Sequence, residues 1–428
     1  MPDRRFRPPL SRAERRTVAA ACGSCVLVLV SVAGWGTPWD WLPGGALPPL
    51  DPTGGLGTVQ LRRIAAYRSA VVPVSLLAVG LSSAVALALG LTTWGSCLVR
   101  RLPGRRRWPV QALLAVALLL AVGQLVTLPL LARVQAVQRS VGLSTQGWAA
   151  WGFDLAKGYL VTVVMTAIPV LIVLALARRF RRWWLPAALL SAGLVVAGSF
   201  VYPLVVEPLF SSFTPMPAGP LRTSLLELAA RDDVPVDDVL VADASRRTTA
   251  VNAYVSGFGA SRRIVVYDTL LQQASPAEVR LVVAHELGHA KRNDVLFGTA
   301  LGALGSLVGI SALALLVSSP RLARRAGYAD AGDVAVVPAL LALAAAGTLL
   351  VAPLQNVVSR AIEARADVHS LDLTRAPATF MATQRRLATA NLSPPEPNLF
   401  SYLMFASHPS LAQRIAIAQG WAAEHPTP

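Results

Sequence analysis

The sequence predicts a mainly α-helical, polytopic membrane protein with about seven transmembrane helices and one small α/β insert. Three observations lead to this fold class. First, 54% of the 428 residues are hydrophobic and only 14% are charged, whereas a soluble domain carries about 25% charged residues. Second, the apolar residues form runs long enough to cross a hydrocarbon core about 30 Å thick. Third, residues 207–294 interrupt these runs with ordinary polarity and many aspartates.

The apolar runs give seven candidate membrane spans, five of which precede residue 210. They cover residues 17–36, 70–98, 109–132, 157–177, 184–206, 295–318 and 334–357. Pro73, Pro129 and Pro169 lie inside three of them, which is tolerated in lipid because neighbouring helices satisfy the freed backbone groups. This pattern predicts an N-terminal five-helix transmembrane domain over residues 1–206. A second domain, residues 207–428, holds the insert and two further spans.

The net charge of +16 comes largely from arginine clusters beside the apolar runs. Arg105–Arg107 and Arg179–Arg182 are two such clusters, and membrane proteins place basic residues in this way near the ends of their spans. We therefore expect a lipid bilayer, and no nucleic acid, as a partner. The mean hydropathy of +0.53 also excludes a purely soluble enzyme and a disordered protein. Cys22, Cys25 and Cys97 lie in apolar segments, which excludes a disulfide framework and a cysteine metal site.

Six arginines between residues 4 and 16 precede the first span, as in a signal sequence. We expect an uncleaved signal anchor, because the apolar run is long and Cys22 lies at its start, where a lipoprotein cleavage site cannot be. If all seven spans cross, the arginine-rich segments (the N-terminus and the 99–107, 178–182 and 319–333 loops) share one side. The positive-inside rule places them in the cytoplasm and residues 207–294 outside. We expect the protein in the cell membrane.

Local signals inside the insert alternate between helix and strand. Residues 220–231 have the 3.6-residue period of an amphipathic helix. Short β-like runs follow at Val239–Ala242, Ala250–Ser256 and Arg263–Tyr267. The segment Ser275-Pro276-Ala277-Glu278 then opens a helix with a serine N-cap, a proline at the first helical position and a glutamate placed for a capping box. The helix that begins there carries the chemistry.

This helix contains His285-Glu286-Leu287-Gly288-His289. Histidines four residues apart lie on one helical face, so both imidazoles can reach one Zn²⁺ while the intervening glutamate projects beside the metal. A catalytic zinc site takes three protein ligands and keeps one tetrahedral position open to water. The alternative is a pair of packed or solvated histidines on an amphipathic helix, but the spacing of the motif is specific. The sequence therefore predicts one zinc ion per chain.

A third ligand must come from farther along the chain. No other histidine follows at the spacing of the metzincin motif. Glu363 lies at the polar end of the last apolar run, and Asp367 follows four residues later on the same helical face. Two carboxylates among arginines ordinarily form a solvated face, but a zinc site that lacks one ligand makes Glu363 its candidate. His369 and His425 have no such context, and we assign them no role.

The His285–His289 motif and the later Glu363–Asp367 segment together resemble the type I CAAX prenyl protease family, membrane-embedded zinc metallopeptidases of the gluzincin class. Three more segments carry the likeness: Pro203–Pro215 after the fifth span, Asn252-Ala253-Tyr254, and Ser407-His408-Pro409 followed by Arg414-Ile415. These matches cover about residues 200–420. The five preceding spans share the family's layout without specific motifs.

The resemblance implies a role for each matched residue of the central motifs. His285, His289 and Glu363 would hold zinc, Glu286 would be the catalytic base and Asp367 would lie behind a ligand histidine. Chemically, a base at Glu286 takes a proton from the attacking water and returns it to the leaving amine. A carboxylate at Asp367 accepts the free ring N–H of a ligand and fixes its tautomer. The resemblance also implies an intramembrane chamber lined by seven helices, and prenylated substrates that face the cytoplasm.

The outlying motifs have both functional and ordinary interpretations. Asn252, Ala253 and Tyr254 lie in a β-like run whose exposed edge would pair with an extended peptide substrate, although Tyr254 also fits a core position. His408 precedes a proline that opens a helix, with Arg414 one to two turns later. A donor there would stabilise the tetrahedral oxyanion, and the alternative is an ordinary capping histidine.

The sequence thus predicts a membrane-embedded zinc endopeptidase, with an α/β metallopeptidase insert, that cleaves membrane-associated or lipidated peptides and proteins. One alternative is a membrane signalling protein with a metallopeptidase domain, but only about 60 residues follow Asp367, too few for a sensor. Another is a non-catalytic scaffold or transporter with structural zinc, which would need a fourth protein ligand. The cytoplasmic face implied by the resemblance conflicts with the charge-derived topology, and nothing in the sequence itself indicates a prenylated substrate, so the substrate and the membrane side stay open.

Overall fold

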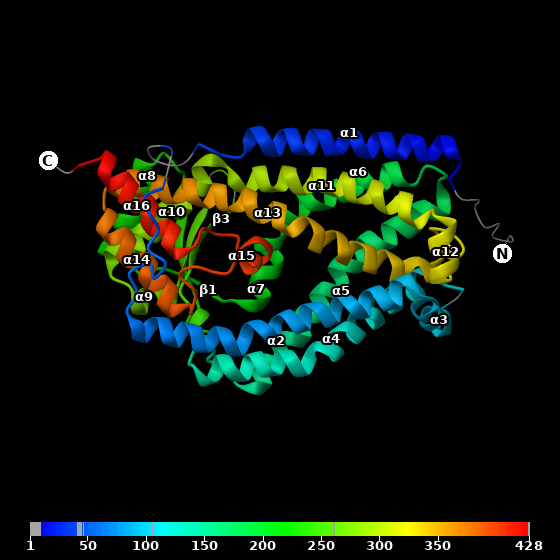
Figure 1. Cartoon of the computed structure of the whole chain (residues 1–428), viewed down its shortest axis with the longest axis horizontal. Helices are drawn as coiled ribbons and strands as arrows, with labels where there is room; N and C mark the ends of the chain where they lie inside the picture. The colour runs from blue at the N-terminus through cyan, green and yellow to red at the C-terminus, as the bar shows by residue number, and fades with distance from the viewer. Residues whose placement is uncertain are drawn as a thin grey trace.

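The structure is a computed structural model that describes residues 10–40, 45, 47–104, 106–257, 259 and 262–426. Arg4, Arg5, Arg7 and Arg105 of the arginine clusters lie outside this described part. The long helices run side by side along the long axis of the molecule (Figure 1). The sheet and the C-terminal helices lie at one end, here the insert end. The start of the first helix, α3 and α12 lie at the other, here the arginine end.

Seven helices of the described chain are long and apolar enough to cross a membrane, which confirms the expected count. They are α1 (Arg12–Gly36), α2 (Thr58–Leu91), α4 (Trp108–Ser140), α5 (Trp148–Arg179), α6 (Trp184–Val201), α11 (Asp294–Val317) and α13 (Val337–Thr374). α6 continues through a π-helical segment (Tyr202–Val206) into the short α7 (Glu207–Phe210). A 3₁₀ turn (Val334–Val336) precedes α13.

The second expected span differs from the structure. We expected one run over 70–98, but α2 begins at Thr58 and ends at Leu91, and α3 (Thr93–Arg101) follows after a break at Thr92. Thr92 is extended (φ −126°, ψ 172°), and its hydroxyl caps α3 by accepting from the backbone N–H of Trp94 at 3.3 Å. The break lies where α13 crosses, since a Cβ on Gly90 would lie 2.2 Å from the Cβ of Ala342. Hydropathy cannot detect this crossing.

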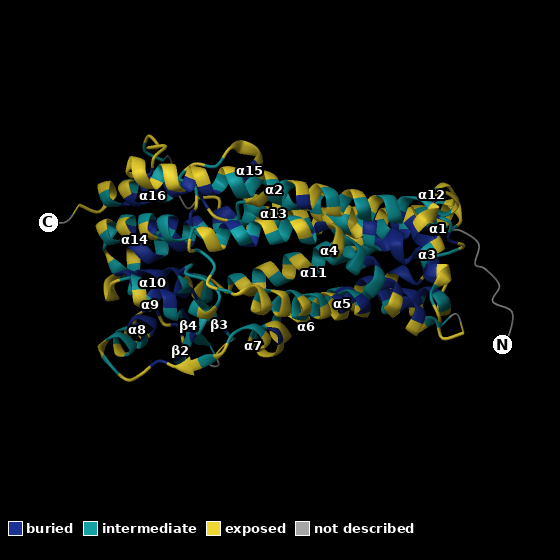
Figure 2. Ribbon diagram, turned by 90° about the horizontal axis from the view of Figure 1, so that it is seen from below, coloured by how far each residue is buried: buried dark blue, intermediate teal, exposed yellow. Residues whose placement is uncertain are grey.

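A large apolar core fills the arginine end. It joins α1, α3, α4, α5, α11, the helix α12 (Pro320–Ala326) and the start of α13. Figure 2 shows this region in dark blue around α1, α3 and α12. Trp183 and Trp184 anchor the turn between α5 and α6 within this core. The arginines of this end therefore lie around a well-packed apolar core formed by the ends of the helices.

The insert folds as a four-stranded sheet with helices on it. The strands are β1 (Phe213–Pro215), β2 (Asp238–Ala242), β3 (Ala253–Ser256) and β4 (Arg263–Tyr267), in the order β1-β2-β4-β3. β2 and β4 are parallel, while β1 with β2 and β3 with β4 are antiparallel. β3 is thus an edge strand, and it begins three residues later than the expected run. β1 is a strand that the sequence patterns did not indicate.

Helices α8 (Pro220–Arg231), α9 (Asp268–Gln273) and α10 (Pro276–Arg292) complete the insert and share its core with the sheet. Three C-terminal helices then return to this end: α14 (Pro377–Ala390), α15 (Leu399–Phe405) and α16 (Leu411–Glu424). α10, α13, α14 and α16 contribute to a second buried cluster that includes Phe380, Leu371 and Trp421. The end of α13 is therefore packed directly against α10.

The bundle is thinly packed next to the insert. Among the described residues, α13 has no buried residue between Ala342 and Arg360, and α5 has none before Val163. α6 has none after Ser191, and α11 has none before Ser311. These stretches are apolar, so they face lipid or one another across incompletely filled space. Figure 2 shows them in teal and yellow between the two dark-blue ends.

Candidate metal centre

The metal centre is built on α10, whose position is set by its first turn and its apolar face. The Ser275 hydroxyl accepts from the backbone N–H of Glu278 (3.4 Å), and the Glu278 carboxylate accepts from that of Ser275 (2.8 Å). This is the expected capping box. Arg386 of α14 pairs with the same carboxylate at 2.7 Å. Val283 and Leu287 are fully buried against the sheet, which fixes the rotation of the helix about its axis.

Three side chains converge from α10 and α13. His285 Nε2 lies 3.2 Å from His289 Nε2 and 3.2 Å from Glu363 Oε2, and His289 Nε2 lies 3.7 Å from Glu363 Oε1. Zinc bonds of about 2.0–2.1 Å in a tetrahedron place two ligand atoms about 3.3–3.4 Å apart. The cluster therefore has the dimensions of three corners of a zinc tetrahedron. The described residues contain no other group of three or more such ligands.

Each histidine has a carboxylate behind it. His285 Nδ1 lies 3.0 Å from Asp367 Oδ1, although the approach is too bent for a well-formed hydrogen bond. His289 Nδ1 lies 2.8 Å from Asp294 Oδ2. Such partners orient a ligand imidazole and leave its Nε2 for the metal. Asp294 was missed by the sequence analysis, although an acidic residue five positions after His289 was a visible signal.

A layer of arginines lies behind these two carboxylates. Arg414 pairs with the fully buried Asp367, with its Nε 2.8 Å from Oδ2. Arg365 pairs with Asp294. Arg414, which we expected near His408 as a site residue, thus has its guanidinium group engaged behind the metal ligands. The charge of each buried carboxylate is compensated from the side away from the metal.

The negative potential of the cluster favours a cation. Burial alone would lower the pKa of His289, but the carboxylates of Asp294 and Glu363 outweigh it and raise the pKa to about 10. Burial opposes charge on His285 as well, and Asp367 and Glu363 nevertheless raise its pKa. The same surroundings would stabilise a divalent cation between the two imidazoles. The donor set of two nitrogens and one carboxylate suits zinc.

Glu286 points toward the cavity on which the cluster opens. This cavity has a volume of about 480 Å³ and is also lined by Asn252, Tyr254 and His408. Burial raises the pKa of Glu286 above its ordinary value of 4.5. A carboxylate with a raised pKa beside a metal is suited to accept and release a proton near neutral pH.

The Asn252–Tyr254 segment lies at the metal cavity, but its side chains point in different directions. Asn252 lines the cavity. Ala253 is 2% exposed and belongs to the core of the insert. The Tyr254 hydroxyl lies 3.3 Å from Glu207 Oε2 on α7, and its ring packs edge-on against Tyr267. Tyr254 therefore connects β3 to the end of the fifth span.

His408 lies next to the metal ligands. Its Nε2 is 3.2 Å from Glu363 Oε2, and its Nδ1 is 2.9 Å from the Ser407 hydroxyl. A carboxylate only accepts, so Nε2 carries the proton when the ring is neutral, and Ser407 then donates to Nδ1. Arg360 of α13 holds this segment by donating to the carbonyl oxygens of Tyr402 (2.9 Å) and Ala406 (2.7 Å). His408 caps no helix, because Ser410 is the N-cap of α16.

A second interaction network braces α10 against α13, and the sequence analysis missed it. His369, to which we assigned no role, lies 2.9 Å from Asp232, and Lys291 pairs with the same carboxylate at 2.8 Å. The imidazole of His369 packs on Gly288, where an added Cβ would lie 2.9 Å from its Cδ2. Gly288 thus permits close contact between the two helices that carry the ligands. His425 stacks on Trp421, away from the metal site.

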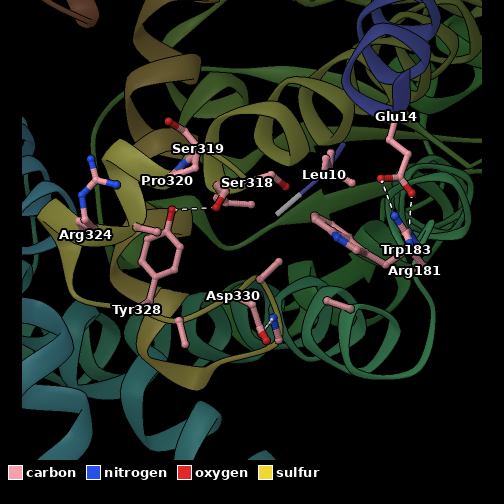
Figure 3. A pocket seen from close by; sticks show the side chains of 16 residues that line it. Leu10, Glu14, Arg181, Trp183, Ser318, Ser319, Pro320, Arg324, Tyr328 and Asp330 are labelled. Atoms are coloured by element: carbon pink, nitrogen blue, oxygen red, sulfur yellow. Dashed lines mark hydrogen bonds and ion pairs between the residues drawn. The ribbon is translucent and has the colours of Figure 1, made fainter. Parts of the chain in front are cut away.

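Another cavity, of about 530 Å³, lies at the arginine end, away from the ligand cluster. Figure 3 shows the side chains that line it, among them Trp183, Ser318, Tyr328 and the ion pair of Glu14 with Arg181. The Tyr328 hydroxyl donates to the carbonyl oxygen of Val317 at 2.9 Å. These contacts tie α1, α5, α11 and the loop before α13 together, and we assign no chemistry to them.

Comparisons with known proteins cover most of the chain. Residues 215–422 match the model of peptidase family M48. Residues 61–212 match the model of the CAAX prenyl protease N-terminal region, described as five membrane helices. An uncharacterized metalloprotease of Bacillus subtilis, YhfN, is 33% identical over 298 residues, which are 69% of this chain and 70% of YhfN.

Eukaryotic relatives match over a shorter part. A CAAX prenyl protease 1 homolog of Oryza sativa is 34% identical over 224 residues, and the match spans 50% of this chain and 51% of the plant protein. The crystal structure of S. mikatae Ste24p superposes with a TM-score of 0.76 at 20% sequence identity, covering 94% of this chain and 98% of that one. At this level of identity the superposition establishes a shared fold.

Proposed function

The chain belongs to peptidase family M48, among the CAAX prenyl proteases, and from this premise we propose that it is a membrane-embedded, zinc-dependent endopeptidase. One observation carries the proposal. The described cluster supplies three ligand residues and opens on a cavity that also holds Glu286. A structural zinc site is normally closed by four protein ligands, whereas a catalytic one keeps a position for water. The donor set therefore favours catalysis over a structural role.

His285, His289 and Glu363 would hold the zinc ion, one per chain. A zinc ion there would lower the pKa of a water molecule toward 7 and polarise the scissile carbonyl group. Glu286 then accepts a proton from the attacking water and donates it to the leaving amine. Asp367 and Asp294 keep the two imidazoles oriented, with Nε2 toward the metal.

We propose that His408 acts on the oxyanion. Its Nε2 lies 3.2 Å from the carboxylate of Glu363, and the carbonyl oxygen of a peptide cleaved beside this ligand would gain negative charge. A donor fixed at that position stabilises the tetrahedral intermediate more than the substrate. Arg360 holds the backbone of this segment, so the donor is already in place before substrate binds.

The edge strand β3 provides a surface for an extended peptide. Tyr267 donates from its backbone N–H to the carbonyl oxygen of Asn252 (3.1 Å), and Tyr254 lies opposite Val265. Because hydrogen-bonding direction alternates along an antiparallel pair, the N–H and C=O groups of Ala253 and Val255 face the free edge. We propose that the substrate adds to this edge as a strand.

In this proposal the two parts of the chain, residues 1–206 and 207–428, have different roles. The first part forms five of the spans, and the second supplies every ligand together with the last two spans. The substrates are peptides or proteins associated with the membrane, since both ligand-bearing helices adjoin spans. We propose the cell membrane as the location. Lipidated substrates of the CAAX prenyl type belong to this proposal as a subclass.

The test compares four purified proteins for zinc content and peptidase activity. Wild type should contain one zinc ion per chain and cleave peptides. Glu286→Gln should keep the zinc and the fold but lose activity by orders of magnitude, because the base is removed without removing a ligand. Glu363→Ala should lose zinc, and Glu227→Ala on the exposed face of α8 should change neither property. Full activity in Glu286→Gln, or unchanged zinc in Glu363→Ala, would contradict the proposal.

A further inference from the structure

A groove at the insert end adjoins the metal cavity. It has a volume of about 790 Å³ and shares Asn252 and His408 with the metal cavity. One wall is the apolar face of α2, including Val72 and Leu76, and the other is formed by the segments around α14, α15 and α16. A substrate that extends past the metal at this junction would therefore enter the groove.

The groove is lined by two arginines and by no carboxylate of the described residues. Arg68, His408 and Arg414 line it, and no described aspartate or glutamate does. Arg414 is already paired with Asp367. Arg68 is different: in the described part of the chain it has no hydrogen-bond or ion-pair partner, although the residue as a whole is only partly exposed. A partly buried guanidinium group without a protein partner is open to an anionic ligand.

The direction of β3 indicates which part of a substrate reaches Arg68. Asn252, before the first residue of β3, is at the junction with the groove, while Gly257, after its last residue, lines only the metal cavity. A peptide that adds antiparallel to β3 runs from Gly257 toward Asn252. Antiparallel pairing is also slightly the more stable of the two. Residues that follow the scissile bond then enter the groove.

We propose that Arg68 binds a substrate carboxylate on the carboxyl side of the scissile bond, which makes it a specificity-determining residue of the enzyme. The proposal rests on the peptidase function proposed above and adds a substrate class to it: peptides with a carboxylate just beyond the cleavage site. The carboxylate is either an acidic side chain or the free C-terminus. Arginine suits both, since its planar fork holds a carboxylate through two parallel hydrogen bonds.

The experiment uses the full-length zinc protein and a pool of random decapeptides with an N-terminal fluorophore. The peptides end either in a free C-terminal carboxylate or in an amide. Each of these two forms is made in two versions, one that includes glutamate at the variable positions and one in which glutamine replaces glutamate. Rates and cleavage sites are measured by mass spectrometry for wild type, Arg68→Gln, Arg68→Lys and Arg62→Gln. Arg62 is the matched control, because it is an exposed arginine of α2 that does not line the groove.

Wild type should prefer peptides with the carboxylate on the carboxyl side by about tenfold or more in kcat/KM, as expected for a hydrogen-bonded charge pair. Arg68→Gln should abolish this preference, so that carboxylate peptides are cleaved no faster than amidated, glutamine-containing ones. Arg68→Lys should keep part of it, and Arg62→Gln all of it. If Arg68→Gln loses only the preference for a free C-terminal carboxylate over an amide, the carboxylate that Arg68 binds is the C-terminus. If it loses only the preference for glutamate over glutamine, the carboxylate is that of a side chain. The proposal would be overturned if Arg68→Gln kept the preference for carboxylate peptides, or if the carboxylate acted on the amino side of the scissile bond.

A binding measurement separates this proposal from the peptidase function. In the Glu286→Gln background, fluorescence anisotropy with the same peptides reports affinity without turnover. The carboxylate peptides should bind about tenfold more tightly than the neutral ones, and Arg68→Gln should remove the difference. Equal binding of both kinds, or no binding of either, overturns the role of Arg68. If the protein binds carboxylate peptides more tightly than neutral ones but the wild type cleaves neither, the result would contradict only the peptidase function.

Discussion

At the residue scale, the metal centre depends on pairs of side chains that come from different helices. Each imidazole of α10 is backed by a carboxylate, and each carboxylate is paired with an arginine. Removal of one outer partner leaves a buried charge uncompensated, which is costly. Without these partners the ligand side chains would be free to rotate. The carboxylates and arginines behind them fix the positions of the ligand atoms before metal or substrate binds.

His408 provides a prediction about rate and pH. His408→Gln should lower kcat by about 10²–10³-fold, the effect of removing one oxyanion donor, with KM and zinc content little changed. Burial lowers the pKa of His408 below its ordinary 6.5, and the charge of Arg414 adds to the effect while Glu363 opposes it. A pKa below 6.5 means that more than half of the His408 rings are neutral at pH 6.5.

Steady-state kinetics across pH 6–8 check both statements. Because most His408 rings are neutral at pH 6.5 and above, wild type should lose less than half of its rate to His408 protonation over that range. Unchanged kcat in His408→Gln, with zinc confirmed, would remove His408 from the chemistry. A variant at Ser407, whose hydroxyl donates to Nδ1, should give a smaller effect of the same kind.

At the element scale, the approach of α10 to α13 determines where the ligands meet. Gly288→Ala would place a Cβ 2.9 Å from the His369 ring, so the two helices should separate by a few tenths of an ångström. We expect a lower melting temperature and weaker zinc binding. His369→Ala should restore both in the double variant, because it removes the clash. Calorimetry and zinc titration of the two single variants and the double variant measure the coupling, and additive losses would contradict it.

The free edge of β3 gives a second prediction at this scale. Ala253→Pro removes an N–H that faces the edge, so KM should rise while zinc content stays the same. Ala253 is also a core residue, so a second measurement avoids any effect on folding. N-methylation of a peptide substrate should weaken its cleavage at every second position. A flat response to N-methylation would place the substrate elsewhere.

The elements that local signals define were predictable from sequence, and those defined by distant contacts were not. The capping box of α10 and the spacing of His285 and His289 lie within a few residues, and hydropathy is enough to find the spans. The break at Thr92 depends on α13 crossing Gly90, and the role of His369 depends on Asp232, which follows the end of α8. β1 has three residues, too few for a periodic pattern. Arg68 gains its significance only from the walls of the groove.

At the scale of the whole molecule, charge is concentrated at the end away from the metal. The segments 1–16, 99–107, 178–182 and 319–333 hold 18 of the 39 basic residues and only 4 of the 23 acidic ones. Their described parts lie together at the arginine end (Figure 1). The positive-inside rule therefore predicts that this end faces the cytoplasm and that the metal centre faces outward.

Cysteine labelling tests this orientation in a cysteine-free background. Thr223 on α8 and Ala329 in the loop after α12 are exposed and lie at opposite ends of the bundle. A maleimide that cannot cross membranes should label Thr223→Cys on intact cells, and Ala329→Cys only after permeabilisation. The reverse pattern would show that the arginine bias fails here and would place the centre on the cytoplasmic side, as the resemblance to CAAX prenyl proteases implies.

The two packed ends and the thin middle imply that the molecule does not melt as one cooperative unit. The core around Trp183 and the core around α10 are separate clusters, and the helices that join them have few buried residues in their described middle stretches. Loss of one therefore exposes little of the other, which is the condition for independent foldons. Amide hydrogen exchange should find two protected regions with different opening free energies. Zinc, bound at one end only, should slow exchange there and leave the other end unaffected.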